Sequence, residues 1–267
     1  MNEIDTINAI FKAYGETVQH MLTLEKELFH LKSIIDTDVS FRGHPDQAFG
    51  HISYAQHGED MLFVNFFHML GISKPTWLDI GAHHPLIISN TALLYKRGGR
   101  GVNIEANPNL YENFVRMRPE DVNVNIGIAP KRNANAPMTF YMIDKYSGRN
   151  TFDRKAAEEF VAQYPDHSIK EQIQVDMICI DDAVERYCNG VYPDLLTIDV
   201  ENLDYDILAS ADFTKNRPKI ICVEVISAGG DTSDKMVKLL NKHGFVIVAK
   251  TIGNYIFAEE RLQNLLN

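Results

Sequence analysis

Strand-like and helix-like patterns alternate through most of this sequence, and this alternation limits the possible folds more than any other feature. Short apolar runs are followed by segments with helix-start signals such as Ser89 and Pro108. We expect strands at 77–80, 101–105, 122–128, 195–199 and 220–225, helices at 89–95, 108–117, 203–210 and 233–242, and a hairpin from 245–250 and 255–258. Such a pattern predicts an α/β protein whose mostly parallel sheet is covered by helices on both faces.

Residues 134–192 interrupt the alternation. They predict a strand at 137–143, a polar loop at 144–150, a helix at 154–164, a strand at 173–180 and a helix at 181–188. This is long for one crossover, so we predict an insertion that shapes a substrate site, the alternative being an insertion without a functional role.

The N-terminal part of the chain has a different pattern. Apolar residues recur at helical spacing through residues 1–38, which predicts a helix that either packs on its own domain or associates with a second copy of the chain. Gly43, Pro45 and Gly50 indicate a linker at 39–53. We therefore expect a main domain at 54–267, with a homo-oligomer as one consequence of the helical extension.

Composition excludes several classes of protein. The 267 residues carry 26 Lys and Arg against 36 Asp and Glu, a net charge of −10, whereas a protein that binds a nucleic-acid polymer needs a basic surface. The three cysteines have no metal-type spacing, which favours a reducing cytoplasm. No apolar run approaches the ~20 residues of a membrane span, so we predict a cytoplasmic protein.

The segment WLDIGAHHPLIISN, at residues 77–90, carries the first chemical signal. Its strand brings Asp79 and Gly81 to the carboxyl edge of a parallel sheet, where α/β folds bind ligands. There is no G-x-G-x-x-G pattern, which disfavours a dinucleotide. Glu105 ends the next strand, at the position where an acidic residue accepts hydrogen bonds from ribose hydroxyls. These features favour an adenosine-type ligand bound without phosphate contacts, and S-adenosylmethionine fits that description.

Further acidic residues follow the later strands. Asp199 and Glu201 come after the strand at 195–199, and Glu224 lies inside an apolar run. Carboxylates placed so could bind a hard cation or accept a proton, and capping of the next helix is the alternative for the first two.

Four segments in this order resemble the FkbM-type family of S-adenosylmethionine-dependent methyltransferases: SYAQHGEDMLF, WLDIGAHHP, GVNIEANP and TIDVENLDYDIL. The resemblance covers residues 53–258 and implies a Rossmann-like, seven-stranded methyltransferase sheet. It also implies methyl transfer to a hydroxyl oxygen. Asn202 departs from the pattern, since the family usually has glycine there.

The resemblance implies cofactor contacts residue by residue. Asp79, Gly81 and His84 are expected at the methionine end of the cofactor. Glu105, with Ala106 beside it, is expected at the ribose.

The remaining implied contacts come from other segments. Gln56 and Asn90 are expected at the methionine carboxylate or amine. Asn125 and Gly127 are expected beside the adenine, with Asp144 at its amino group.

For catalysis we predict Asp199 as general base, with His84 as a further candidate. In a metal-assisted version, Asp199, Glu201 and Glu224 would hold one Mg²⁺ or Mn²⁺ ion.

The resemblance also implies the acceptor, which we expect to be a sugar hydroxyl on a nucleotide-linked sugar or another glycan precursor of polysaccharide biosynthesis. Lys145, Arg149 and Arg154 are candidates for binding a diphosphate, while Tyr146, Ser147 and Asn150 could recognise hydroxyls. The alternatives are a macrolide or other natural-product hydroxyl, a non-catalytic scaffold that retains the fold, and an NAD-dependent sugar dehydrogenase.

Overall fold

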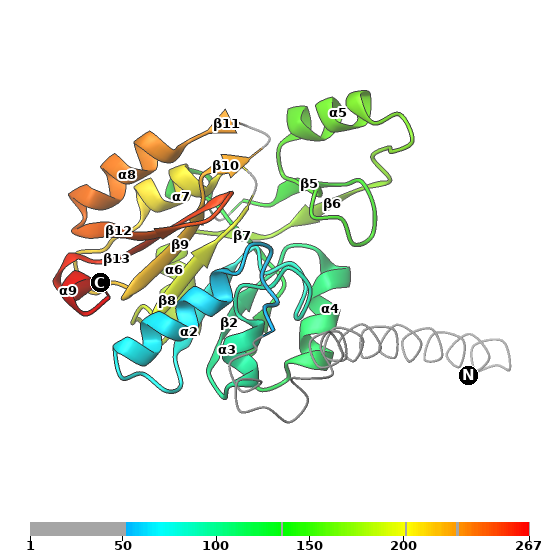
Figure 1. Cartoon of the computed structure of the whole chain (residues 1–267). Helices are drawn as coiled ribbons and strands as arrows, with labels where there is room; N and C mark the ends of the chain where they lie inside the picture. The colour runs from blue at the N-terminus through cyan, green and yellow to red at the C-terminus, as the bar shows by residue number, and fades with distance from the viewer. Residues whose placement is uncertain (1–51, 135, 201, 228–229, 267) are drawn as a thin grey trace, which may run out of the picture. The chain divides into compact units, whose positions relative to one another are not determined.

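A computed structural model describes residues 52–266 of the chain, with the exceptions of 135, 201 and 228–229. The predicted helix at 1–38 and almost all of the predicted linker therefore lie outside the described residues. The chain from Ser53 onward forms one unit, which is built on a seven-stranded sheet (Figure 1).

The strand order of this sheet is β12-β13-β9-β8-β1-β2-β3. All neighbours run parallel except those of β13, which is antiparallel to both β9 and β12. In the order of the sheet, the strands span Phe245–Lys250, Asn254–Glu259, Ile220–Glu224, Leu195–Ile198, Thr76–Ile80, Arg100–Ile104 and Val122–Val124. Because β1 lies between β2 and β8, the strand order reverses there, and a crevice opens at the carboxyl ends of these strands.

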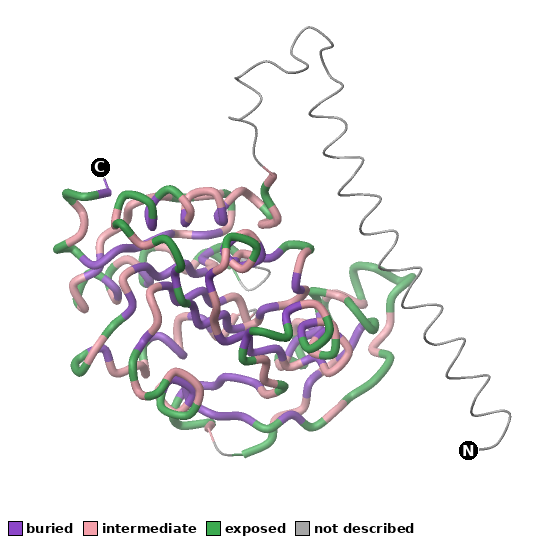
Figure 2. The backbone as a smooth tube through the Cα atoms, turned by 90° about the horizontal axis from the view of Figure 1, so that it is seen from below, coloured by how far each residue is buried: buried purple, intermediate pink, exposed green. Residues whose placement is uncertain are grey.

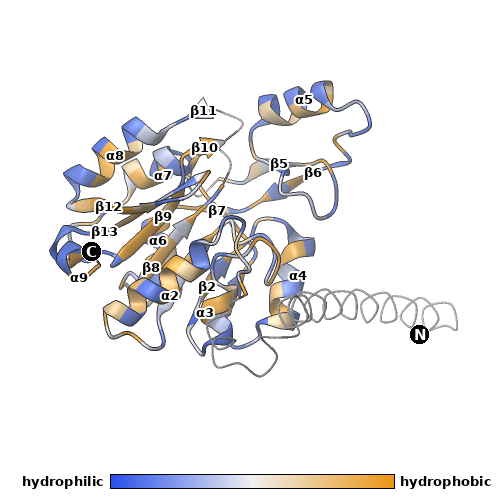
Figure 3. Cartoon of the chain, in the orientation of Figure 1, coloured by the Kyte–Doolittle hydropathy of each residue, from blue (hydrophilic) through white to orange (hydrophobic). Residues whose placement is uncertain are grey.

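Helices cover both faces of the sheet, which confirms the predicted Rossmann-like α/β architecture. Leu78 belongs to a core shared with α6, α7 and α8, while its neighbour Trp77 belongs to a core on the other face, shared with α2, α3 and α9. Helices α6, α7 and α8 span Ile180–Tyr187, Asp204–Ser210 and Ser233–Lys242. Helices α2, α3 and α9 span Glu59–Met69, Ala92–Lys96 and Gln263–Leu266. Figures 2 and 3 show the strands as the buried and apolar centre. None of the described helices combines the length and apolarity needed to cross a bilayer.

Most of the remaining elements lie around the carboxyl edge and along the inserted segment. α4 (Pro108–Met117) packs beside β3. β5 (Met138–Met142) and β6 (Glu171–Val175) form an antiparallel pair with α5 (Arg154–Gln163) between them in sequence (Figure 1). Two shorter strand pairs are β4 (Gly127–Ile128) with β7 (Met177–Ile178) and β10 (Ile226–Ser227) with β11 (Gly230–Asp231). The described 3₁₀ helices span Lys131–Asn133 and Glu260–Leu262.

The structure corrects several sequence-based expectations. The strand expected at 173–180 is divided into β6 and β7, and helix α6 already begins at Ile180. The strand expected at 122–128 is divided, because β3 ends at Val124 and the chain then pairs with β7 as β4. The helix expected from Ser89 begins only at Ala92, with Thr91 at its N-cap, and Ser89 lies before it with its N–H donating to the Tyr54 carbonyl. Helix α2 was not expected, although its acidic first turn is a common N-terminal signal.

Candidate functional site

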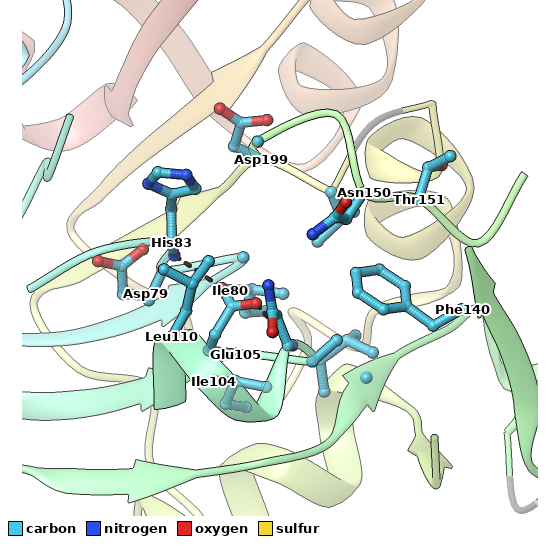
Figure 4. Close-up of a pocket in the computed structure, with 18 of the residues that line it drawn as sticks. Asp79, Ile80, His83, Ile104, Glu105, Leu110, Phe140, Asn150, Thr151 and Asp199 are labelled. Atoms are coloured by element: carbon cyan, nitrogen blue, oxygen red, sulfur yellow. Dashed lines mark hydrogen bonds between the residues drawn. The ribbon is translucent and has the colours of Figure 1, made fainter. Parts of the chain in front are cut away.

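A cavity of about 480 Å³ opens at the carboxyl edge of the sheet. Its walls include the ends of β1, β2, β8 and β9, together with the first half of the inserted segment. Figure 4 shows Asp79, His83, Glu105 and Asp199 on one side of it, and Phe140, Asn150 and Thr151 on the other. The cavity thus lies at the reversal of strand order, where the sequence predicts the ligand site.

Gly81 begins the loop that follows β1. Its φ of +77° is in the left-handed region, and a β-carbon on it would collide with the carbonyl of Asp199. We expected this glycine to let a ligand approach closely. In the structure it lines the cavity, but the space beside its α-carbon is taken by the end of β8. Glycine is therefore needed to bring the loops after β1 and β8 together.

Glu105, which follows β2, has both carboxylate oxygens held by backbone amides. Oε2 accepts from the His83 N–H and Oε1 from the Asn107 N–H, each at 2.8 Å. Its side chain lines the cavity, and burial raises the pKa of its carboxyl to about 7, opposed by these two hydrogen bonds. A carboxylate oriented in this way still has lone pairs to accept two hydroxyl hydrogens from a ligand.

Asp79 is connected to a buried arginine through a hydroxyl. The Thr91 hydroxyl donates to Asp79 at 2.8 Å and accepts from Arg118, whose guanidinium also pairs with Asp121. Burial raises the pKa of Asp79 to about 6, which the Thr91 hydrogen bond and the charge of Arg118 oppose. This network orients the Asp79 carboxylate at the cavity wall.

Asp199 and Glu224, at the ends of β8 and β9, both line the cavity. Glu201, the third predicted metal ligand, lies outside the described residues. Within the described part of the chain, no group of three or more His, Cys, Asp or Glu side chains is arranged to hold a metal ion. The metal site therefore stays a prediction.

The two adjacent histidines differ in their positions. His83, with a φ of +55°, lines the cavity, whereas His84 does not. The His84 Nδ1 accepts from the backbone N–H groups of Leu86 and Ile87, and burial lowers its pKa to about 4. A neutral His84 that accepts through Nδ1 carries its hydrogen on Nε2, so no nitrogen is available to take a proton from a substrate. This geometry weighs against His84 as general base.

Most of the residues that the resemblance assigned to the cofactor surround this cavity. Those that line it are Gln56, Asp79, Gly81, Asn90, Glu105, Ala106 and Gly127. Asn125 is not among the lining residues, and its side chain donates to the carbonyls of Glu105 and Ala106. Asp144 also lies outside the lining and accepts from the Tyr146 N–H. These two residues support the walls of the cavity.

The inserted segment contributes more of the cavity than the motifs indicate. Phe140 and Phe152, whose ring centroids are 4.7 Å apart, line it together with Thr151, and none of the three was singled out from the sequence. The alternation of Phe140 along a strand was the available signal, but it fits a core residue equally well. Among the three candidate diphosphate-binding cations, Arg149 lines the cavity, whereas Lys145 and Arg154 do not.

Comparisons with known proteins show that the sequence matches a family model. A model described as the methyltransferase FkbM domain matches residues 79–247. Among solved structures, a precorrin-6y C5,15-methyltransferase from Geobacter metallireducens GS-15 is 15% identical with a TM-score of 0.37, covering 78% of this chain and 91% of that one. A "putative RNA methyltransferase" from Pyrococcus horikoshii is 10% identical with a TM-score of 0.34, covering 77% and 87%. No curated protein matches the sequence.

Proposed function

Because the chain belongs to the FkbM methyltransferase domain family, we propose that it is an S-adenosylmethionine-dependent O-methyltransferase that acts on a sugar hydroxyl. The observation that supports this most directly is the carboxylate of Glu105, presented to the cavity by two backbone N–H groups. Such a group suits the paired hydroxyls of a ribose.

The charge of the cavity fits this cofactor better than a dinucleotide. Four consecutive strands of the sheet each contribute one carboxyl group to the lining, those of Glu224, Asp199, Asp79 and Glu105. Arg149 is the cationic side chain of the described lining. S-adenosylmethionine carries a sulfonium and an ammonium against one carboxylate, whereas a pyrophosphate would bring two negative charges to these acids. In addition, α3 begins only at Ala92, so no helix starts directly after Gly81 to bind a pyrophosphate.

The residues of the cavity have separate tasks in the proposed reaction. When bound, S-adenosylmethionine supplies an activated methyl group. Glu105 accepts hydrogen bonds from the ribose hydroxyls, and Gln56 and Asn90 bind the methionine end of the cofactor. Asp199 takes the proton of the acceptor hydroxyl, which is a poor nucleophile while protonated. The walls hold the two reacting groups together, which lowers the entropic part of the barrier.

We propose a nucleotide-linked or other glycan-precursor sugar of polysaccharide biosynthesis as acceptor, in the cytoplasm. Supporting this, the loop that contributes Tyr146, Ser147, Arg149 and Asn150 to the lining presents hydroxyl, amide and guanidinium groups, which suit sugar hydroxyls and a diphosphate. A macrolide or other natural-product hydroxyl is the alternative acceptor. Turnover of a panel of nucleotide sugars and polyketide alcohols, followed by release of S-adenosylhomocysteine, distinguishes the two.

The first test is a thermal shift with S-adenosylhomocysteine. A ligand that binds only the folded state at a hundredfold excess over its Kd stabilises the protein by about 2.7 kcal/mol. The expected result is a clear increase in melting temperature, while NAD gives none. If neither ligand changes the melting temperature, the non-catalytic scaffold becomes the favoured function. Repeating the measurement with EDTA and with Mn²⁺ tests the metal-assisted version, in which Mn²⁺ would raise the melting temperature and EDTA would reverse the increase.

Two further proposals can be checked with variants. Asp199→Asn should abolish methyl transfer and leave binding of S-adenosylhomocysteine within a few-fold, because the base contacts the acceptor proton. Normal turnover by this variant would exclude Asp199 as base.

Association of two copies through residues 1–38 should be lost when these residues are deleted, and an unchanged mass in light scattering would contradict it.

A further inference from the structure

Asn107 lies at a junction between the carboxylate of Glu105 and the inserted loop. Its side chain is buried, with 1% of the residue exposed. Its backbone N–H donates to Glu105, and its Nδ2 donates to the Lys145 carbonyl at 3.0 Å. Its Oδ1 accepts from the N–H of Asn109 and so caps helix α4. One residue thus contacts the proposed ribose site, a helix and the loop at 144–151.

His83 makes a second connection of the same kind. Its backbone N–H donates to the other oxygen of Glu105, and its imidazole lies against the loop, because a β-carbon on Gly148 would be only 3.5 Å from its Nε2. The two residues whose amides hold the Glu105 carboxylate therefore both contact the loop with their side chains, Asn107 at Lys145 and His83 at Gly148.

The loop itself is braced by internal hydrogen bonds. Asn150, which is 7% exposed, accepts from the Ile143 N–H and donates to the Asp144 carbonyl. Asp144 accepts from the Tyr146 N–H, and Ser147 accepts from the Arg149 N–H. A loop braced in this way moves as a unit, so its position over the cavity depends on its connections to the neighbouring elements.

We propose that Asn107, together with His83, is a positioning residue that couples the Glu105 carboxylate to the loop at 144–151. When a ribose donates hydrogen bonds to Glu105, the carboxylate is fixed in position. The backbone amides of His83 and Asn107 that donate to it are then fixed as well, and so are the side chains of these two residues, which contact the loop. Cofactor binding thereby stabilises the loop position in which Tyr146 and Arg149 line the cavity. The coupling rests on the proposed function for the identity of the ligand at Glu105.

Trypsin provides a direct measurement, because the loop contains two cleavage sites, after Lys145 and after Arg149. Asn107→Ser keeps a helix-capping oxygen but is too short to reach the Lys145 carbonyl. Losing one buried hydrogen bond should raise cleavage at the two loop sites about fivefold to tenfold. Cleavage after Lys238, within helix α8, reports global unfolding and should stay slow.

The coupling itself is measured by adding S-adenosylhomocysteine. In the wild-type protein it should slow cleavage of the loop, and in Asn107→Ser this protection should fall severalfold although the ligand still binds within a few-fold. A purely structural role for Asn107 would leave the protection ratio unchanged. Asn107→Asp, which keeps the cap and loses the donor, should behave like Asn107→Ser. Asn113→Asp makes the same charge change on the exposed side of α4 and is the matched control.

Loop cleavage and protection within twofold of wild type in both Asn107 variants would overturn the proposal. If a variant unfolds and Lys238 is cleaved rapidly, His83→Asn replaces it, since asparagine tolerates the positive φ and removes the imidazole that lies against the loop at Gly148. If S-adenosylhomocysteine does not bind the wild-type protein, the proposed function fails, while cleavage of the ligand-free variants still decides whether Asn107 positions the loop.

Discussion

At the scale of single residues, Glu105 has the clearest expected effect. Glu105→Ala removes the acceptor of two hydroxyl hydrogens, and hydrogen bonds to a charged group each contribute about 1.5–3 kcal/mol. Binding of S-adenosylhomocysteine should weaken at least about 100-fold in calorimetry. The 2′-deoxy analogue should bind the wild-type protein more weakly but should lose less affinity from the mutation. Equal losses for both ligands would mean that Glu105 does not contact the ribose.

Thr91 should act on Asp79 without touching the ligand. Thr91→Val removes the hydroxyl that donates to Asp79 and accepts from Arg118, so the pKa of Asp79 should rise further above its ordinary value. Two buried polar groups also lose a partner, and the free energy of unfolding should fall by about 1–3 kcal/mol. NMR titration of the Asp79 carboxyl and urea unfolding measure the two effects. An unchanged pKa would show that the hydroxyl does not control the ionisation of Asp79.

How far residues could be predicted depends on how local their signals are. Glu105 and Asp79 were predictable because a carboxylate at the end of an apolar strand is costly to bury unless it has a partner or a ligand. The choice between His83 and His84 was not predictable, since it depends on the positive φ of His83, which turns the first imidazole toward the cavity and the second toward the loop backbone. The sequence N-P-N is typical of a helix start, so it indicates the capping role of Asn107. It does not indicate the contact of Asn107 with Lys145, which lies 38 residues away.

At the scale of the elements, Gly81 joins the ends of β1 and β8. Gly81→Ala should lower the free energy of unfolding by more than about 3 kcal/mol, because the left-handed φ costs roughly 1–2 kcal/mol and the β-carbon collides with the Asp199 carbonyl. Gly71 is a matched control, with a φ of +71° and nothing within 4 Å of an added β-carbon. Gly71→Ala should cost only the strain, about 1 kcal/mol in urea unfolding. Similar losses for both would contradict the role of the collision.

Asn202 can be understood at the same scale. Its φ of +77° is in the region that glycine and asparagine adopt most readily, so the family's usual glycine and this asparagine serve the same turn. Asn202→Gly should change stability by less than about 0.5 kcal/mol, whereas Asn202→Val should cost about 1–2 kcal/mol. Thermal unfolding compares the two variants, and a tolerated valine would show that the turn has another conformation.

The elements themselves were mostly predictable. Helices α4 and α8 and strand β12 begin and end where the pattern predicts, because a proline near the first turn, a polar start and a continuous apolar run are local signals. The division of 122–128 was not predictable. It depends on Gly127, whose missing side chain leaves room for Met177 of β7, and that contact spans 50 residues of sequence.

At the scale of the whole molecule, the buried carboxyls make stability depend on pH. The folded-state pKa of Glu105, about 7, lies above its ordinary value of 4.5, so its contribution to stability is present at low pH and is lost as the pH rises through 7. Below about pH 6.5 the lowered pKa values of His83 and His84 oppose this effect, because they favour the folded state as the pH rises.

Asp79, whose pKa is also raised, to about 6, loses most of its contribution below pH 6.5, so the window from about pH 6.5 to 8 reports mainly on Glu105. The free energy of unfolding of the ligand-free protein should fall by about 1 kcal/mol across it, as urea titrations at several pH values can measure. Glu105→Ala should remove this slope. A slope that persists in the variant would assign the titration to another group.

The position of β13 has a consequence for synthesis. β13 is the last strand of the sheet in sequence, yet it lies between β9 and β12, which both precede it. While a ribosome has not yet released residues 254–259, β9 has an unpaired edge and β12 has no neighbour in the sheet. An exposed edge of this kind invites pairing with other chains. Premature termination before Asn254 would therefore leave an aggregation-prone fragment.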